Sequence, residues 1–490
     1  MKRKSLSLFV LVFFCLAAIA AADSVDTKSV DPTQVLAWLT AGISNSRLIR
    51  LVHERGINFV PTESEIRTLE SAGADEKLVL ALKRVKSGIV RDARPSIQPA
   101  LEQASVDAHG RRYHEAELQL RTALRSDSQN AAIHFALAAM LRQQEQWDDA
   151  FDELTLSTQL MPDFPENHSS FAYIFYRLDD GPNAIAEART ALSMDPQNAE
   201  TYQYLGLGLY SNGQYSAAVH AFAESLVRDA DNPDTYYDMG IALQADGNLT
   251  SAAAAYRYAI HLRPDFWEAH SNLGLVLHHD RRFEEAIAEY LQAKRSAPEE
   301  ASIRNNLGNT YCDKGDFDAA ITELSELYRQ HPEWEHGHTC LAQAYMAKRN
   351  YRSAVQQWQL AVREKPNGST EHRMLGQALL MDGQPEEALR EFRLSVTLDP
   401  DSDAAHHFLG TALFEGQQLQ AAEKEFREAV RLNATPDNHY SLAACLMSMD
   451  RYEEALSELE IASRLDPEKP LYRARRDELL KLMRGTNSSR

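Results

Sequence analysis

A period of 34 residues runs through most of the chain and constrains its fold more than any other feature. Between Ala199 and Asp401 the same residue types return at the same phase. In each unit a glycine or alanine follows a leucine or methionine, an alanine stands twelve residues later, and a proline usually closes the unit. The small residue at the first of these phases is Gly206, Gly240, Gly274, Gly308, Ala342 and Gly376 in successive units. A fixed period of this length indicates a repeat array, in which each unit buries its apolar face only against its neighbours.

Each unit has the pattern of two helices. Between Trp267 and Glu300 the apolar residues recur at helical spacing twice, once around Leu273 and again around Ala286, and the polar stretch 279–282 separates the two runs. Proline near the end of the unit stops the second helix, because it lacks an amide hydrogen and crowds the preceding turn. The small residues let the paired helices approach closely. The sequence therefore predicts an all-α fold built from antiparallel helix pairs.

The unit 301–334 carries a set of residues that resembles the tetratricopeptide repeat consensus. These residues are Leu307, Gly308, Tyr311, Gly315, Phe317, Ala320, Leu324 and Pro332. The resemblance implies an α-solenoid, a right-handed superhelix in which the first helix of each unit lines a concave surface. Ten units begin at Ala131, Pro165, Ala199, Pro233, Trp267, Ala301, Glu335, Ser369, Asp403 and Pro436, and the last of them begins one residue early.

The period also divides the chain. We expect ten repeats over 131–469, a degenerate capping repeat over 97–130 and a C-terminal capping helix over 470–485. A small helical module is expected over 31–90, with two similar helix–turn–helix halves. A polar stretch, 86–96, links it to the array. The module resembles helical segments found ahead of other domains in exported bacterial proteins.

The first 22 residues have the pattern of a secretory signal peptide. Lys2, Arg3 and Lys4 precede an apolar run that ends in three alanines, Ala20 to Ala22. The alternative is an uncleaved anchor, because the run is at the short limit of a membrane span. We therefore expect an exported protein of the periplasm or cell envelope, with secretion as the alternative. It would touch a membrane only if this segment is kept.

Three cysteines, Cys312, Cys340 and Cys445, follow the expected signal peptide. An odd number of cysteines far apart in the sequence predicts no disulfide framework. We expect them to be buried thiols that pack as small apolar groups.

No arrangement of residues in the sequence has the pattern of a catalytic, cofactor or metal site. A glycine-rich phosphate loop, a nucleophile elbow and a His-Glu-x-x-His motif are all missing, so we expect no enzyme and no cofactor. A row of histidines shares one phase: His134, His168, His270, His338, His372, His406 and His439. A metal ladder or a pH sensor is one interpretation, but equivalent side chains of stacked units lie about 10 Å apart, too far to share a metal ligated at about 2 Å. We therefore predict that these imidazole rings pack near the start of each first helix. The clusters at 278–279 and 331–338 remain alternatives for metal.

The formal charge of −20 argues against polyanionic partners. Nucleic acids and anionic membranes are bound by clustered Lys and Arg, which release counterions. The remaining partner class is a protein or an extended peptide.

The candidate binding surface is the first-helix face. We define it as the second, fifth, ninth and twelfth residues of each first helix, with their neighbours, which lie away from the packed Leu-Gly edge. Tyrosine supplies large apolar area with few rotatable bonds, and asparagine can bond the backbone of an extended peptide. The alternative is that the tyrosines only fill grooves between repeats. The candidate residues are Tyr173, Tyr176, Tyr204, Leu207, Tyr210, Tyr237, Ile241, Asn272, Asn305, Asn306, Asn309 and Gln343.

These features predict an exported, non-enzymatic scaffold that holds a protein or peptide segment on this face for complex assembly. A second hypothesis is an accessory subunit of an envelope machine for secretion, pilus assembly or polysaccharide export, which would act through its edges or convex side. A third is an enzyme whose site lies in the N-terminal module, where Arg50, His53, Glu54 and Arg55 form the only reactive-looking cluster.

Overall fold

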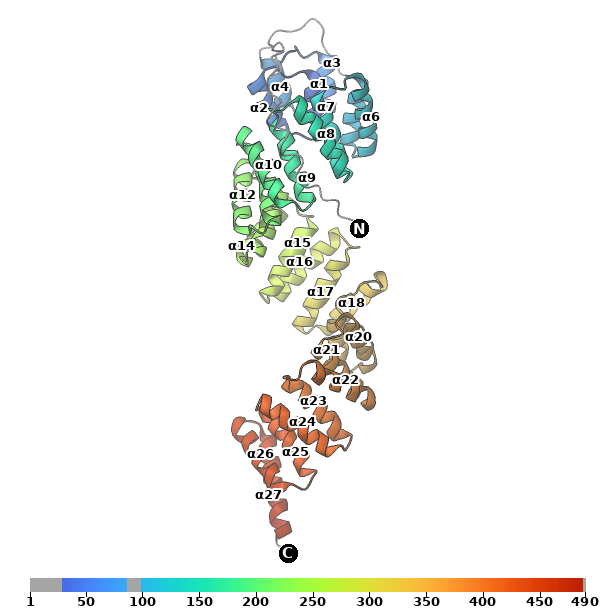
Figure 1. Cartoon of the computed structure of the whole chain (residues 1–490), viewed down its shortest axis with the longest axis vertical. Helices are drawn as coiled ribbons and strands as arrows, with labels where there is room; N and C mark the ends of the chain where they lie inside the picture. Colours follow the sequence, from blue (N-terminus) through green and yellow to red (C-terminus); the bar gives the residue numbers. More distant parts are fainter. Residues whose placement is uncertain (1–28, 86–97, 488–490) are drawn as a thin grey trace. The chain divides into compact units, whose positions relative to one another are not determined.

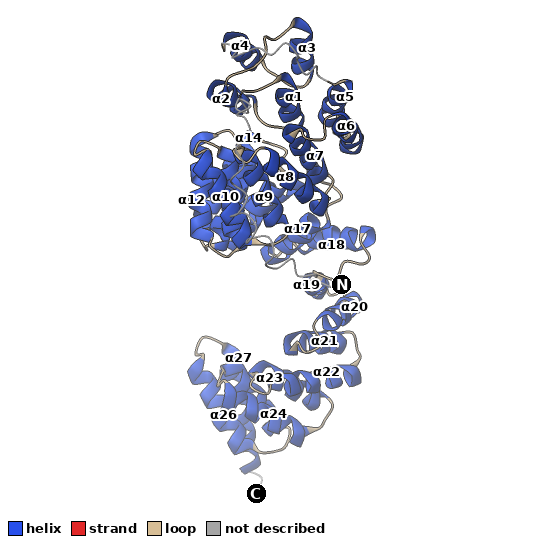
Figure 2. Ribbon diagram, turned by 45° about the horizontal axis from the view of Figure 1, so that its top comes forward, coloured by secondary structure: helices blue, strands red, loops and turns tan. Residues whose placement is uncertain are grey.

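The computed structural model describes residues 29–85 and 98–487, and all named elements in these ranges are α-helices (Figure 1, Figure 2). The expected signal peptide (1–22) and the linker (86–96) lie outside the described residues. The chain divides into two compact units, an N-terminal unit of residues 1–248 and a C-terminal unit of residues 249–490, and each is described by itself.

The N-terminal unit holds four short helices followed by helix pairs. The short helices are α1 (Pro32–Thr40), α2 (Asn45–Arg55), α3 (Glu63–Ser71) and α4 (Glu76–Arg84). The pairs are α5 (Pro99–His109) with α6 (Tyr113–Ser126), α7 (Ala131–Gln143) with α8 (Trp147–Leu160), and α9 (Pro165–Arg177) with α10 (Gly181–Met194). They are followed by α11 (Ala199–Ser211) with α12 (Tyr215–Arg228), and by α13 (Pro233–Ala245).

The C-terminal unit begins with α14 (Leu249–Leu262) and continues the same succession. Its pairs are α15 (Trp267–His279) with α16 (Phe283–Ser296), α17 (Ala301–Lys314) with α18 (Phe317–Gln330), and α19 (His338–Ala347) with α20 (Tyr351–Glu364). Further along are α21 (Ser369–Met381) with α22 (Pro385–Leu398), α23 (Asp403–Glu415) with α24 (Leu419–Leu432), and α25 (Pro436–Met447) with α26 (Tyr452–Leu465). The last helix is α27 (Pro470–Asn487).

In five of the pairs, a glycine of the first helix faces a large side chain of the second: Gly206, Gly274, Gly308, Gly376 and Gly410. A Cβ atom built on Gly308 would lie 2.5 Å from Leu324 Cγ, and one on Gly206 would lie 2.5 Å from the ring of Phe222. Real side chains do not approach this closely, so the glycine is required by the spacing of the helices. This is the close approach that the sequence predicts.

One first helix starts late. The phase of the repeat begins a unit at Glu335, whereas α19 begins at His338. Gly337 has φ +93°, a left-handed conformation that does not belong to a helix, and it lies against Asn305 Oδ1. The chain therefore enters α19 only after this glycine.

A histidine joins the two helices of most repeats. In six of the seven phased histidines, Nδ1 lies 2.5–2.6 Å from a glutamate carboxylate 19 residues later, in the second helix of the same repeat. His338 contacts Gln357 instead, at 2.8 Å. In His134 and His270, Nε2 also lies 3.1–3.2 Å from a backbone carbonyl, so acceptors face both nitrogens. Two acceptors favour the imidazolium form, and the pKa of each of these two histidines is raised, because the carboxylate and the carbonyl outweigh burial.

Cys312 and Cys340 form a disulfide, which corrects the prediction of three free thiols. Their sulfur atoms are bonded and their Cα atoms are 6.1 Å apart. The two residues are 28 positions apart in sequence, but they lie on α17 and α19, the first helices of neighbouring repeats, which contact each other. Stacking of repeats therefore brings them together. Cys445 is free and buried, as expected.

The short N-terminal helices pack on the array. Helix α1 contacts α5 and α7, both first helices, and Trp38 stacks on Phe164 with 5.1 Å between ring centroids. This contact leaves Ala132 and Phe135 of α7 buried at 0% and 5% exposure. These are the second and fifth residues of their helix, so the module covers the beginning of the first-helix face.

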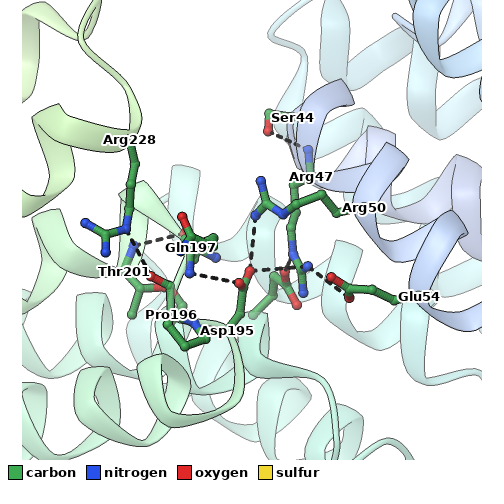
Figure 3. A network of polar contacts seen from close by, with 12 residues as sticks. Ser44, Arg47, Arg50, Glu54, Asp195, Pro196, Gln197, Thr201 and Arg228 are labelled. Atoms are coloured by element: carbon green, nitrogen blue, oxygen red, sulfur yellow. Dashed lines mark hydrogen bonds and ion pairs between the residues drawn. The ribbon is translucent and has the colours of Figure 1, made fainter.

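An ion-pair network secures this contact (Figure 3). Arg47 of α2 donates through Nε to Glu166 of α9, and its Nη1 lies 3.2 Å from Asp195, the residue that directly follows α10. Arg50 donates to the same Asp195 at 3.1 Å. Burial lowers the pKa of Arg47, but Glu166 and Asp195 more than offset this and hold it raised. The buried guanidinium and the carboxylates thus neutralise one another at the interface.

Candidate protein-binding surface

The open part of the first-helix face in the N-terminal unit begins where the module ends. Arg142, at the end of α7, and Tyr173 and Tyr176, on α9, are only partly buried, in contrast to Phe135. The face therefore starts with an arginine and a pair of tyrosines.

Aromatic rings and guanidinium groups alternate at this point. The Arg142 guanidinium lies 4.6 Å from the ring centre of Tyr173, and the Arg177 guanidinium lies 4.7 Å from that of Trp147. Tyr173 also lies 5.0 Å from Tyr204 and accepts a hydrogen bond from Arg177 at 3.1 Å. These contacts hold the side chains in fixed positions, so the surface is organised before any partner binds.

Tyr204 is the floor of this cluster. It is 8% exposed, accepts a hydrogen bond from Arg142 and donates one to Glu200. Burial, followed by the Glu200 charge, raises its pKa well above the usual range. Tyr204 therefore positions Arg142 and Glu200 and has little surface of its own to offer a partner.

A hollow of about 380 Å³ opens over these residues. Its walls come from the first helices α7, α9, α11 and α13 and the turns beside them. It is lined by Arg142, Gln143, Glu145, Tyr173, Arg177, Gln203, Tyr204, Asn232 and Asp234. Most of these side chains are polar, so the hollow suits a segment with charged or hydrogen-bonding groups.

Asp238 lies close to this hollow and has no cationic partner among the residues the structure describes. Its Oδ2 accepts a hydrogen bond from Gln203 at 2.8 Å. Burial raises the pKa of Asp238 to about 7, and the Asp234 charge adds to the increase. Burial raises the pKa of Tyr176, and the charge of Asp238 raises it further. The Tyr176 hydroxyl and the Asp238 carboxyl are therefore close together. The first-helix face thus holds a poorly solvated carboxyl beside a tyrosine.

The other candidates of the N-terminal unit are partly buried. Leu207 and Tyr210 pack against the cluster around Phe222, and Tyr210 contacts Tyr215 of its own repeat with 5.5 Å between ring centres. Tyr237 and Ile241 lie on α13 with part of their surface exposed.

The candidates of the C-terminal unit do not form one cluster. Asn272, Asn305, Asn306 and Asn309 are partly buried and Gln343 is exposed. Nδ2 of Asn305 lies 3.4 Å from Oδ1 of Asn306, while its own Oδ1 is buried without a hydrogen bond. An amide oriented in this way faces Gly337 of the next repeat rather than an open surface.

The two histidine clusters considered for metal are otherwise engaged. His278 contacts Thr310 and Asp313, at 2.8 and 3.0 Å, and His338 stacks on Tyr328. Over residues 29–85 and 98–487 no group of three or more His, Cys, Asp or Glu could hold a metal ion. Within the same described ranges, no helix has the length and apolar character needed to cross a membrane.

Comparison with known proteins agrees with the helix pairs. A family model described as the tetratricopeptide repeat matches residues 101–158, 170–234, 237–301, 341–405 and 409–470, and a second model with that description matches 301–324. The chain belongs to the tetratricopeptide repeat family. Tetratricopeptide repeats are a protein-interaction scaffold and not a catalytic fold, and the α-solenoid expected from the sequence is confirmed.

Several solved structures are similar to the chain. The MamA protein is 23% identical over 35% of this chain and 94% of its own, with a TM-score of 0.33. Cut9–Hcn1 of the APC/C is 15% identical over 76% and 73%, with a TM-score of 0.42. Yeast Tom70 is 13% identical over 78% and 95%, with a TM-score of 0.33. No curated protein matches the sequence.

Sequence reasoning missed the charged residues of this tetratricopeptide repeat surface. Arg142 is the twelfth residue of its first helix and satisfies the rule that defined the face, but the rule was applied only from the next repeat onward. Glu200, a second residue, also satisfies it. Asp238 is a sixth residue and lies just outside it. Applying the rule to every charged residue of every repeat, and to the neighbouring sixth position, finds all three.

Proposed function

We propose that this protein is an exported scaffold that binds a segment of a partner protein on the first-helix face of its N-terminal unit. The observation that carries the proposal is the hollow above Tyr173 and Tyr204, with its fixed arginine and tyrosine side chains. A preorganised surface loses less conformational entropy on binding than a mobile one. Tyrosine and arginine are also the side chains most often found at binding hot spots.

Export is supported by two independent features. The first is the basic and apolar pattern of residues 1–22. The second is the disulfide between Cys312 and Cys340, because structural disulfides persist in oxidising compartments such as the periplasm. We place the scaffold in the periplasm or cell envelope.

Co-purification tests the proposal. The chain is used as bait in an envelope extract of its source organism, and bound proteins are identified by mass spectrometry. The test variant is Tyr173→Ala/Tyr176→Ala, which removes two partly exposed rings and spares the buried Tyr204. The control variant is Tyr258→Ala, which removes a tyrosine that is 58% exposed on the second helix α14.

A partner that the intact chain and the control retain, and that the test variant loses, supports the proposal. A partner that all three retain contradicts it and favours an accessory subunit that acts through edges or second helices. Circular dichroism of each variant checks that the helix content is unchanged.

A further inference from the structure

The Glu166–Asp195 pair that holds Arg47 recurs elsewhere in the array. Glu166 is the second residue of its repeat, and Asp195 directly follows the second helix of the same repeat. Both positions are acidic in only three of the ten repeats: Glu166 with Asp195, Glu200 with Asp229, and Asp437 with Asp466. The combination is therefore a distinct subset of the repeats.

One of these three pairs holds a cation from another part of the chain, and in a second pair one carboxylate holds a cation of its own repeat. Arg47 of the N-terminal module contacts Glu166. It also contacts Asp195 (Figure 3). At the other end of the array, Lys469, the last residue of its own repeat, donates to Asp437 at 2.8 Å and makes no ion pair with Asp466. In the first case the segment that packs on the repeat supplies the basic side chain.

In the third pair, Glu200 and Asp229 are both exposed, and neither makes a direct ion pair with any residue in the described part of the chain. Burial lowers the pKa of Arg142, but the Tyr204 and Glu200 charges more than offset this, so Arg142 is a cation near Glu200 that does not contact it directly. Glu200 accepts only the hydroxyl of Tyr204. Arg228, although next to Asp229, is engaged with Glu224, the Pro196 carbonyl and the ring of Tyr202.

The position of Asp229 is otherwise unfavourable. It follows the last residue of α12, where the carbonyl groups of the helix end repel a carboxylate. Asp195 and Asp466 offset this by accepting a backbone N–H two residues later, at 3.0 and 3.2 Å. Asp229 has no such bond within the described residues. Val227, two residues earlier, is 79% exposed, so an apolar side chain next to Asp229 is open to solvent.

We propose that Glu200 and Asp229 are the receptor for a basic side chain, arginine or lysine, on a helical segment of the bound partner protein. This inference rests on the proposed function and specifies the chemistry of its partner. Glu200 is on the first-helix face and is joined through Tyr204 to Arg142, so the pair lies beside the hollow. Asp238 gives the same stretch of the face a further carboxyl without a counter-charge.

Helix α2 of the chain itself provides the probe, because it is the segment seen bound to such a pair. A labelled synthetic peptide of residues 44–56, held helical by a staple between positions 49 and 53, is titrated into the intact full chain at low salt. The Glu166–Asp195 pair is already filled by the chain's own module, so the open pair is the available receptor. Fluorescence anisotropy reports binding.

We expect the Glu200→Gln/Asp229→Asn variant to bind the peptide about tenfold more weakly, because charge-assisted bonds are lost. Gln at 200 keeps an acceptor for the Tyr204 hydroxyl. The control variant Asp148→Asn/Asp149→Asn removes the same charge from exposed positions of the second helix α8 and is expected to bind normally. A peptide with Arg47→Gln and Arg50→Gln is expected to lose the same factor.

Equal affinity for the intact chain and the Glu200→Gln/Asp229→Asn variant overturns the inference, as does failure of the intact chain to bind the peptide. The same variant separates this inference from the proposed function. A natural partner lost by Tyr173→Ala/Tyr176→Ala but retained by Glu200→Gln/Asp229→Asn contradicts the basic-side-chain receptor and leaves the proposed function standing. A partner retained by both variants contradicts the proposed function itself.

Discussion

Nδ1 of His134 lies 2.6 Å from Oε2 of Glu153, and Nε2 of the same ring lies 3.2 Å from the carbonyl oxygen of Ser128. The ring thus joins the first helix of a repeat to its second helix and to the turn that precedes both. His270 makes the same contacts with Glu289 and Pro264. The first prediction concerns these two histidines.

The free energy of unfolding should fall as the pH rises above the ordinary histidine pKa of about 6.5. The folded-state pKa of His134 and His270 is raised, so their contribution is fully present below that pH and is lost as the pH rises through the raised value. His134→Gln/His270→Gln should flatten the dependence of melting temperature on pH between about 6 and 8. His220→Gln, at an exposed histidine of α12, serves as the control. An unchanged slope in the double variant would contradict the prediction.

Substitution of Asp238 should stabilise the fold, because the charge of its carboxylate is poorly solvated. Its pKa of about 7 lies above the unfolded value of about 3.9, so the folded state binds a proton more tightly and loses stability as the pH rises between these values. Asp238→Asn should therefore stabilise the chain at pH 8 by about 1 kcal/mol, allowing for solvent screening, and have little effect near pH 4. Chemical unfolding at both pH values measures this. Destabilisation at pH 8 would show that the ionised carboxylate is well accommodated.

The Arg47 contact should behave as a buried ion pair. Arg47→Met leaves Glu166 buried and unpaired, which typically costs about 3–5 kcal/mol. Adding Glu166→Met removes the unpaired charge and should recover much of the lost stability, because Asp195 still forms its ion pair with Arg50. The rate of hydrogen exchange of the α1 and α2 amides measures whether the module is released from the array. Additive losses in the double variant would argue against direct coupling.

Gly308→Ala should destabilise the repeat that contains α17 and α18 by roughly 1–3 kcal/mol, because the new methyl group would overlap Leu324. Gly416→Ala, where the nearest atom is 3.3 Å away and φ is negative, is the control. Thermal unfolding compares the two. Equal stability would mean that Leu324 can move aside.

Reduction of the disulfide should lower stability by about 2–4 kcal/mol. Cys312→Ser/Cys340→Ser should show the same loss and no further response to reductant. Unreduced, denatured protein that begins after residue 22 should contain one reactive thiol, Cys445, whose pKa burial raises to about 11 in the fold. Three thiols in that material would contradict the disulfide.

Much of this fold could be predicted from the sequence because the repeat makes it local. The spacing of Gly308 from Leu324 lies within one unit, and the same pairing recurs along the chain, so periodicity alone indicates the helix pairs. The docking of the module could not be predicted. Arg47 and Glu166 are 119 residues apart and belong to elements with different patterns, so no period relates them.

The candidate site was predicted less completely for a related reason. A rule for the exposed face selects positions and does not reveal what covers them, so Tyr204 was chosen although Arg142 and Glu200 enclose it. The disulfide was missed because separation along the chain was treated as separation in space. Counting positions within repeats, the twelfth of one and the sixth of the next, would have placed Cys312 beside Cys340.

The disulfide also has a mechanical consequence. Successive repeats of such an array can be pulled apart one at a time when the chain is stretched from its ends. The bond between Cys312 and Cys340 holds 28 residues of chain in a closed loop across one junction. Under load those residues cannot lengthen the chain, which shortens its full extension by about 100 Å. The two repeats that flank this junction would therefore yield as a single unit.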